Sequence, residues 1–132
     1  MAESLDAGVY SPAVIDHFQN PRNAGSMPDP DAVGVQSNPV CGDTMRLMLR
    51  IRDGHIVEVR WQTSGCPAAI ATSSIASELM TGMTLAEAAG LTRERIALTA
   101  GGLPPAKIHC SVLAADALRH ALADYRARAA CG

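Results

Sequence analysis

Three cysteines of this chain lie beside residues that form turns, and two further polar side chains accompany them. Cys41 is followed by glycine, Cys66 lies between glycine and proline, and Cys110 follows a stretch that contains two prolines. Asp43 stands two residues after the first thiol, and His109 directly precedes the last. Thiolates and imidazoles bind zinc and iron–sulfur clusters, and a carboxylate adds a hard oxygen ligand. The set indicates a shared metal site, although cysteines are also common in protein cores without any such function.

The residues around Cys110 form the stretch Leu-Pro-Pro-Ala-Lys-Ile-His-Cys-Ser, which begins at Leu103. Its two prolines fix φ and lack a backbone donor, so no helix can run through them. Cys66 and Cys110 each precede a segment with helical spacing, and a helix N-terminus favours a thiolate. His109 is compatible with three roles there: a metal ligand, a proton donor to a neighbouring thiolate, or a helix cap. Lys107 is close enough to lower the thiol pKa values, although a lone lysine in a loop is usually just exposed.

The remaining histidines and the fourth cysteine carry no comparable signal. His17, His55 and His120 fall on predicted surface faces, and Cys131 is the penultimate residue. The chain has no CxxC pair, no Walker A loop, no GxGxxG and none of the zinc-deaminase elements, so the functions that depend on those motifs lose their support. In a reducing compartment, four cysteines are better explained as metal ligands, catalytic thiols or core residues than as disulfides.

The composition indicates one domain with an aliphatic core. The 132 residues are 48% hydrophobic but only 3% aromatic, and the net charge is −2. Few aromatic residues and no basic run argue against nucleic-acid binding. Residues 1–9 are predicted to be an acidic, flexible lead without a signal peptide, residues 10–130 a single domain, and no apolar run approaches a membrane span. We therefore expect a cytoplasmic protein that binds neither nucleic acids nor membranes.

The first half of the domain predicts a helix and then three strands. Ser11 caps a short helix that has Pro12 in its first position. Alternation over 45–52 and 55–63, on either side of an Asp-Gly turn, predicts a hairpin, and a weaker strand covers 32–36. The apolar residues predicted to lie on the covered faces of the hairpin strands are Leu47, Leu49, Ile51, Val57, Val59 and Trp61.

The second half of the domain predicts only helices. One begins at Pro67, a short one has Thr84 and Glu87 as a capping box, and two more cover 92–100 and 110–128. The order of one helix, three strands and several helices predicts an α+β fold, in which a three-stranded antiparallel sheet packs against the helices.

Four motifs cover nearly the whole domain in a fixed order. The first reads Val-Ile-Asp-His-Phe-Gln-Asn-Pro-Arg-Asn over 14–23, and the second is Cys-Gly-Asp over 41–43. The third is Gly-Cys followed by Ala-Ile-Ala-Thr-Ser-Ser over 69–74, and the fourth is the stretch 103–111. From Tyr10 to Tyr125 the chain resembles the IscU/NifU-type iron–sulfur cluster scaffold family, and the resemblance implies the sandwich fold of that family.

The resemblance implies a scaffold rather than an enzyme, on which a [2Fe–2S] cluster is assembled from iron and sulfur and then handed to apo iron–sulfur proteins. It places the cluster ligands at Cys41, Cys66 and Cys110, with Asp43 or His109 completing the set. It also makes Cys110 the main acceptor of persulfide sulfur and Asp43 the residue that tunes cluster release. Zn²⁺ would fit the same tetrahedral set of ligands.

The resemblance further implies protein partners. A cysteine desulfurase would supply sulfur, and ferredoxin and frataxin-like proteins are also expected to bind. A DnaK-type chaperone with its J-protein would grip one exposed segment, which consists of Leu103, Pro104, Pro105, Ala106 and Lys107. Tyr10 matches a tyrosine linked in the family to dimer formation, so we expect a monomer or a transient homodimer.

Two other functions remain compatible with the residues. One is a zinc-dependent sulfurtransferase that resembles the SufU type, and the other is a purely structural zinc domain. SufU-type relatives carry an insertion before the last cysteine and lack the histidine next to it. This chain shows neither feature: the insertion is not seen, and His109 directly precedes Cys110. The comparison favours the IscU branch.

Overall fold

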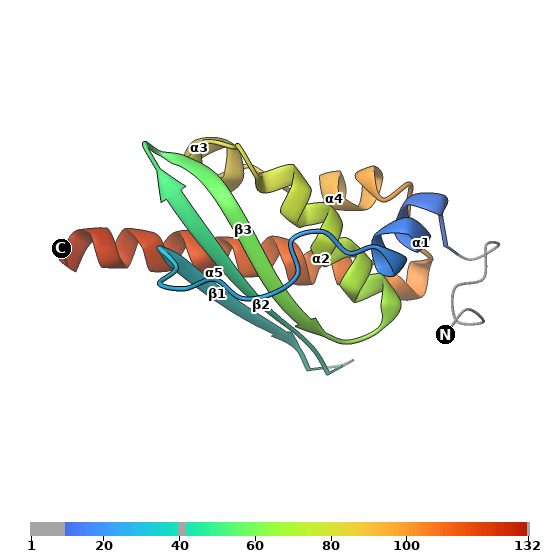
Figure 1. Ribbon diagram of the computed structural model, residues 1–132. Coiled ribbons are helices and arrows are strands. Elements are labelled where there is room, and N and C mark those ends of the chain that lie inside the picture. The colour runs from blue at the N-terminus through green and yellow to red at the C-terminus, as the bar shows by residue number, and fades with distance from the viewer. Residues whose placement is uncertain (1–9, 40–41, 132) are drawn as a thin grey trace.

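The computed structural model describes residues 10–39 and 42–131, so Cys41 and the lead 1–9 lie outside the described residues. A three-stranded antiparallel sheet, in the order β1-β2-β3, packs against helices, as predicted (Figure 1). Within the described residues no helix is long and apolar enough to cross a membrane. The elements are α1 (Pro12–Gln19), β1 (Ala32–Asn38), β2 (Asp43–Arg52), β3 (His55–Ser64), α2 (Pro67–Met80), α3 (Leu85–Ala89), α4 (Arg93–Thr99), the 3-10 turn η2 (Pro105–Lys107) and α5 (His109–Cys131).

The β2–β3 hairpin follows from its two-residue turn. Asp53 and Gly54 both adopt positive φ, 52° and 75°, which is the geometry of the turns that match the twist of two adjacent strands. Arg52 therefore pairs directly with His55, and the ladder continues antiparallel from there. The sequence predicted this connection because aspartate and glycine tolerate the left-handed region.

The predicted inward face of β3 is wrong at its first residues. Ile56 is fully buried and Val57 is 48% exposed, the reverse of the prediction. The register shifts between Arg50 and Ile51, so Glu58 and Ile56 pair with consecutive residues of β2 and leave Val57 out of the ladder. Such a bulge inverts the alternation on one side of it, whereas residues beyond it keep their predicted face.

The outer face of the sheet is also partly covered, which the alternation did not predict. Met48 falls on the same strand face as the arginines of β2, yet only 2% of it is exposed. The connection between α1 and β1 runs over this region, because the Arg50 guanidinium donates hydrogen bonds to the carbonyls of Pro28 and Asp29 at 2.7 Å. Met27 in the same connection is buried as well.

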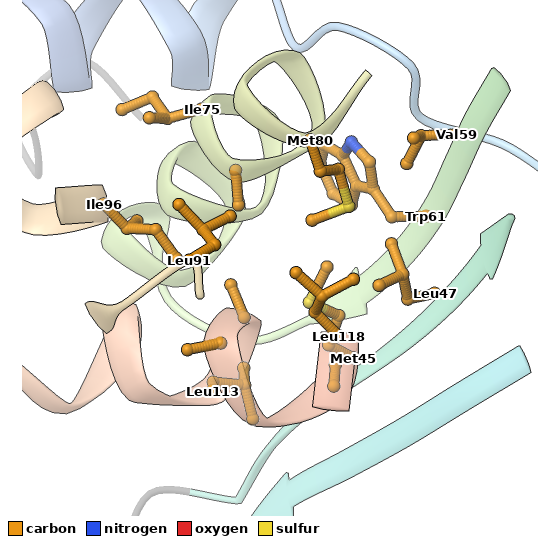
Figure 2. Close-up of a cluster of buried hydrophobic side chains, with 14 of the residues drawn as sticks. Met45, Leu47, Val59, Trp61, Ile75, Met80, Leu91, Ile96, Leu113 and Leu118 are labelled. Atoms are coloured by element: carbon orange, nitrogen blue, oxygen red, sulfur yellow. The ribbon is translucent and has the colours of Figure 1, made fainter. Parts of the chain in front are cut away.

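The core lies between the sheet and the helices α2, α4 and α5 (Figure 2). Trp61 is its one large aromatic side chain in that view, and the rest is aliphatic or methionine, as the composition predicted. The other labelled side chains are Met45, Leu47, Val59, Ile75, Met80, Leu91, Ile96, Leu113 and Leu118.

Helix α5 lies directly on strand β1 because both surfaces are made of small residues. A Cβ added at Gly34 would lie 2.1 Å from the backbone oxygen of Ala117 and 2.5 Å from the nitrogen of Ala121. Any side chain at position 34 would therefore push the helix away. This contact sets the position of α5 over the sheet, and with it the position of its first turn.

The helix starts are as predicted. The hydroxyl of Ser11 accepts a hydrogen bond from the Val14 amide, and Pro12 occupies the first turn of α1. Thr84 and Glu87 form the predicted capping box of α3. These contacts join residues three positions apart, so the sequence alone specifies them.

His17 is not on the surface as predicted. Only 13% of its side chain is exposed, with Nδ1 2.8 Å from the hydroxyl of Ser74 and Nε2 3.5 Å from Glu78. Burial lowers the pKa of His17. The Arg22 amide donates a hydrogen bond to the same Ser74 hydroxyl at 2.8 Å. Two residues of the 14–23 motif therefore contact α2 at one side chain. His55 and His120 are exposed, as predicted.

Candidate metal centre

The structure brings together all four of the predicted ligands that it describes. Asp43 is the first residue of β2, Cys66 is the N-cap of α2, and His109 and Cys110 form the first turn of α5. Asp43, Cys66 and Cys110 are separated by 23 and 44 residues in the sequence, but their elements meet at one end of the sheet. The fifth predicted ligand, Cys41, lies outside the described residues.

The donor atoms are within a few ångströms of one another. The Sγ atoms of Cys66 and Cys110 are 3.8 Å apart, and Cys66 Sγ is 3.8 Å from Asp43 Oδ2. His109 Nε2 is 3.7 Å from Cys110 Sγ. Ligand atoms of Asp43, His109 and Cys110 all lie within 4.8 Å of each other. Asp43, His109 and Cys110 therefore form one compact group of donor atoms, and Cys66 lies next to it, in contact with Asp43 and Cys110.

These separations fit a four-coordinate metal. Two sulfurs bound to zinc at 2.3 Å with tetrahedral angles would be about 3.8 Å apart. The two thiols already have this spacing and form no disulfide. The mixture of soft sulfur with nitrogen and oxygen is also a set that binds iron in clusters.

Gly65 allows the carboxylate to reach the thiols. A Cβ at this position would lie 2.5 Å from Oδ1 and 2.7 Å from Cγ of Asp43. The turn between β3 and α2 can therefore lie against the carboxyl group only if residue 65 has no side chain. The sequence analysis treated Gly65 only as part of a motif and missed its contact with Asp43. The signal for this contact was a glycine directly before a predicted ligand cysteine.

The two described thiols differ in protonation. The pKa of Cys66 is lowered to about 6, mainly by a hydrogen bond with the thiol of Cys110. The backbone amide of Ala69 and the charge of Lys107 also lower it, whereas burial and Asp43 act in the opposite direction. The pKa of Cys110 is raised, because its proton is held by Cys66 and because the side chain is buried. Cys66 is therefore the more readily ionised thiol of the coupled pair.

The thiols also differ in access. Cys110 is fully buried, whereas Cys66 is only half-buried. The segment before α5 is more open: Pro105 and Ala106 are exposed, and Lys107 is half-buried. Tyr10 is buried beside the centre, and burial raises the pKa of its phenol, with smaller effects from Lys107 and the two cysteines.

The family is settled by comparison with known proteins. The NifU-like N terminal domain family matches residues 9–132. This chain belongs to that family. The iron–sulfur cluster assembly scaffold protein IscU 1 of Archaeoglobus fulgidus is 54% identical over 117 residues, which cover 89% of this chain and 76% of the relative. The scaffold protein IscU of Azotobacter vinelandii is 48% identical over 121 residues, covering 89% of this chain and 94% of that protein.

Solved structures share the fold of this NifU-like domain. The N-terminal part of a NifU-like protein from Brucella abortus superimposes with a TM-score of 0.74 at 20% identity, covering 92% of this chain and 97% of that one. A SufU scaffold from Fervidobacterium islandicum gives 0.73 at 21% identity, over 89% and 98% of the two chains. At these identities the likeness establishes the α+β fold alone.

Proposed function

We propose that this NifU-like domain is a scaffold on which an iron–sulfur cluster is assembled and from which it is passed to apo-proteins. The observation that carries the proposal is the group of donor atoms from Asp43, His109 and Cys110, with Cys66 Sγ 3.8 Å from both Asp43 Oδ2 and Cys110 Sγ. Relatives about half identical to this chain are named iron–sulfur cluster assembly scaffold proteins. The cluster is the cargo of such a protein rather than a permanent part of it.

The finer proposal is a [2Fe–2S] cluster held by Cys41, Cys66 and Cys110, with Asp43 or His109 as the fourth ligand. Both of these last residues lie within 4.8 Å of Cys110, and Asp43 also lies 3.8 Å from the sulfur of Cys66. Ligands at loop ends and in first helical turns suit a cluster that is later passed on, because small movements of these segments change its coordination.

Sulfur is proposed to arrive as a persulfide on a cysteine desulfurase. A thiolate of this chain attacks the terminal sulfur, a new S–S bond forms, and the desulfurase cysteine leaves as a thiolate. Release of that sulfur as sulfide takes two electrons, which a ferredoxin-type donor would supply. Cys110 is the proposed final acceptor; its contact with Cys66 and its burial raise its pKa, and the nearby charge of Lys107 opposes this rise only in part.

Burial adds a condition to sulfur transfer. Cys110 is fully buried, while Cys66 is half-buried. A partner's persulfide therefore reaches the sulfur of Cys110 only after neighbouring groups have moved. We propose that a partner, either the desulfurase or a DnaK-type chaperone with its J-protein, binds the exposed Pro105 and Ala106 and thereby causes this movement.

Tyr10 remains a proposed dimer residue. Because it is 7% exposed in the single chain, a dimer contact through its side chain requires the start of the domain to open. Frataxin-like proteins stay proposed partners on the strength of the family relationship.

A second candidate is a zinc-dependent sulfur acceptor of the SufU type, which the tetrahedral spacing of the two sulfurs favours. Anaerobic reconstitution with iron, cysteine and a desulfurase separates the two functions. A scaffold gains the visible absorption of a cluster and loses it to an apo-ferredoxin. A sulfur acceptor stimulates the desulfurase while zinc stays bound, and a structural zinc domain does neither, which would overturn the proposal.

A further inference from the structure

A hollow of about 560 Å³ lies between α4 and the start of α5, and we name it the α4–α5 groove. Two large apolar side chains on its wall are open to solvent: Leu98 is 80% exposed and Ile108 is 50% exposed. Such exposure costs free energy in a protein of this size unless something covers it. The residues that line the groove are Arg93, Glu94, Ala97, Leu98, Gly102, Leu103, Ile108 and Ser111.

The described chain begins at one end of this groove. The hydroxyl of Ser11 donates a hydrogen bond to the carbonyl of Ala100, just after α4 ends. A Cβ at Gly101 would lie 3.0 Å from Cβ of Ser11, and Gly102 is already part of the groove wall. Residues 1–9 therefore join the domain next to the groove.

The lead has the length and chemistry to fill the groove. Nine extended residues reach about 30 Å, whereas the seven residues of α4 rise only about 10 Å. Leu5 and Val9 are the large apolar residues of the lead that follow Met1. They are four positions apart, a spacing that puts them on one face of a strand and on one face of a helix alike. Glu3 and Asp6 give the lead a negative charge, and the exposed Arg93 stands at the groove wall.

We propose that residues 1–9 dock in the α4–α5 groove of the same chain, with Leu5 and Val9 covering Leu98 and Ile108. Ion pairing adds little, since Arg93 already contacts Glu94 at 3.0 Å in an exposed pair. Apolar contact is the main driving force. The docked lead also covers Leu103 and Ile108, which flank the segment that leads to His109 and Cys110. This inference does not depend on the proposed scaffold function.

The test compares backbone amide NMR spectra of the full chain with those of a variant that lacks residues 1–8. Amides of Ala97, Leu98 and Ile108 shift on deletion, while those of the distant Gly54 turn do not. Leu5→Asp reproduces the shifts, because it places a charge against the apolar wall. Ser4→Asp adds the same charge outside the face shared by Leu5 and Val9, and leaves the groove amides unchanged.

A charge exchange completes the design. Leu98→Lys alone releases the lead, and Leu98→Lys combined with Leu5→Asp restores the shifts of the docked state. Leu98 is largely exposed, so its replacement leaves the fold intact, and Val57→Lys is the control at another exposed apolar side chain. Chemical shifts of the groove amides that stay unchanged in both the deletion variant and Leu5→Asp would overturn the proposal. Shifts that depend on protein concentration, with a doubled mass in light scattering, would assign the groove to a second copy instead.

Discussion

At the scale of single residues, the two described cysteines of the centre have different surroundings. Cys66 and Cys110 have the same side chain and their sulfurs are 3.8 Å apart, yet the pKa of the half-buried Cys66 is lowered and that of the buried Cys110 is raised. The difference arises from what surrounds each sulfur: a helix N-terminus and a donated hydrogen bond around Cys66, and complete burial around Cys110. Each residue of the centre therefore has its own testable role.

The thiolate of Cys66 can be measured through its reaction with iodoacetamide. In the metal-free protein, the alkylation rate at Cys66 is constant above pH 7 and falls about tenfold per pH unit well below the pKa of about 6, because only the thiolate reacts. Cys110→Ala removes the main hydrogen-bond donor and moves the midpoint toward the ordinary thiol value, about 8.5. Cys110→Ser keeps a donor and shifts the midpoint less. Position-resolved mass spectrometry follows the rate.

A midpoint in Cys110→Ala that equals the wild-type value would assign the lowered pKa of Cys66 to the helix terminus and Lys107. Lys107→Ala is then the discriminating variant, since it removes the nearby positive charge.

Cys110 is expected to be the final acceptor of sulfur. Cys110→Ser abolishes the stable persulfide after incubation with a desulfurase, because a hydroxyl does not form one. Intact-mass and peptide mass spectrometry record an added sulfur on wild type and none at position 110 in the variant. Cys66→Ser is the companion variant, since Cys66 is the more accessible thiol. A full sulfur adduct on Cys110→Ser would transfer the role to Cys66 or Cys41.

Asp43 is expected to control how long the cluster stays. Asp43→Ala is expected to form a cluster that persists longer and transfers more slowly, a direction taken from the family resemblance, in which this aspartate goes with cluster lability; a carboxylate is a hard ligand for sulfide-bridged iron. The half-life of the visible absorption, and the rate of transfer to an apo-acceptor, report the effect. Faster loss with unchanged transfer would make Asp43 a structural ligand.

At the scale of elements, the centre depends on where α5 lies. Its first turn carries His109 and Cys110, and its middle packs on β1 through Gly34 with almost no space between them. The first residue of β2 and the first turn of α2 bring the other ligands to the same end of the sheet. A shift of α5 over the sheet would therefore move half of the ligands away from the rest.

Gly34→Ala tests this dependence. The added Cβ would meet a backbone oxygen at 2.1 Å, which cannot move without the helix, so we expect a loss of about 2 kcal/mol or more in the free energy of unfolding. Urea unfolding followed by circular dichroism measures the loss, and cluster yield should fall with it. Gly90→Ala is the matched control, because its Cβ would meet nothing closer than 3.5 Å and its φ is negative. Equal midpoints for the two variants would contradict the close contact.

At the scale of the whole molecule, a bound metal ties together segments that are far apart in the chain. The core is aliphatic, with Trp61 as its large aromatic anchor, and the ligands lie at its edge on three different elements. A ligand that binds only the folded state stabilises it by mass action, by about 4 kcal/mol at a thousand times the dissociation constant. Metal binding and folding are therefore expected to be coupled.

Removal of zinc or iron with a strong chelator should lower the midpoint of thermal unfolding by about 10 °C or more. Cys66→Ser combined with Cys110→Ser should abolish the difference between the metal-loaded and chelated samples, because the two described thiols are gone. Differential scanning calorimetry, with metal content measured on each sample, provides the comparison. Identical midpoints for metal-free and metal-loaded wild type would contradict the coupling.

The sequence by itself determined the local features of this protein. The caps at Ser11 and Thr84 and the Asp53-Gly54 turn involve residues within four positions of each other, so their geometry depends on little else. The motifs also identified the family. The alternation of β2 and β3 placed Leu47 and Trp61 in the core correctly, because both lie on the regular side of the bulge.

Only the tertiary structure decided what depends on residues that are distant in the chain. The bulge that buries Ile56 in place of Val57 is a property of the pairing between two strands, and His17 is covered by Ser74, which is 57 residues away. The opposite pKa shifts of Cys66 and Cys110 require a contact across 44 residues. Periodicity reports which residues lie on one face of an element, whereas burial, pKa and coordination depend on the atoms that another element brings to that face.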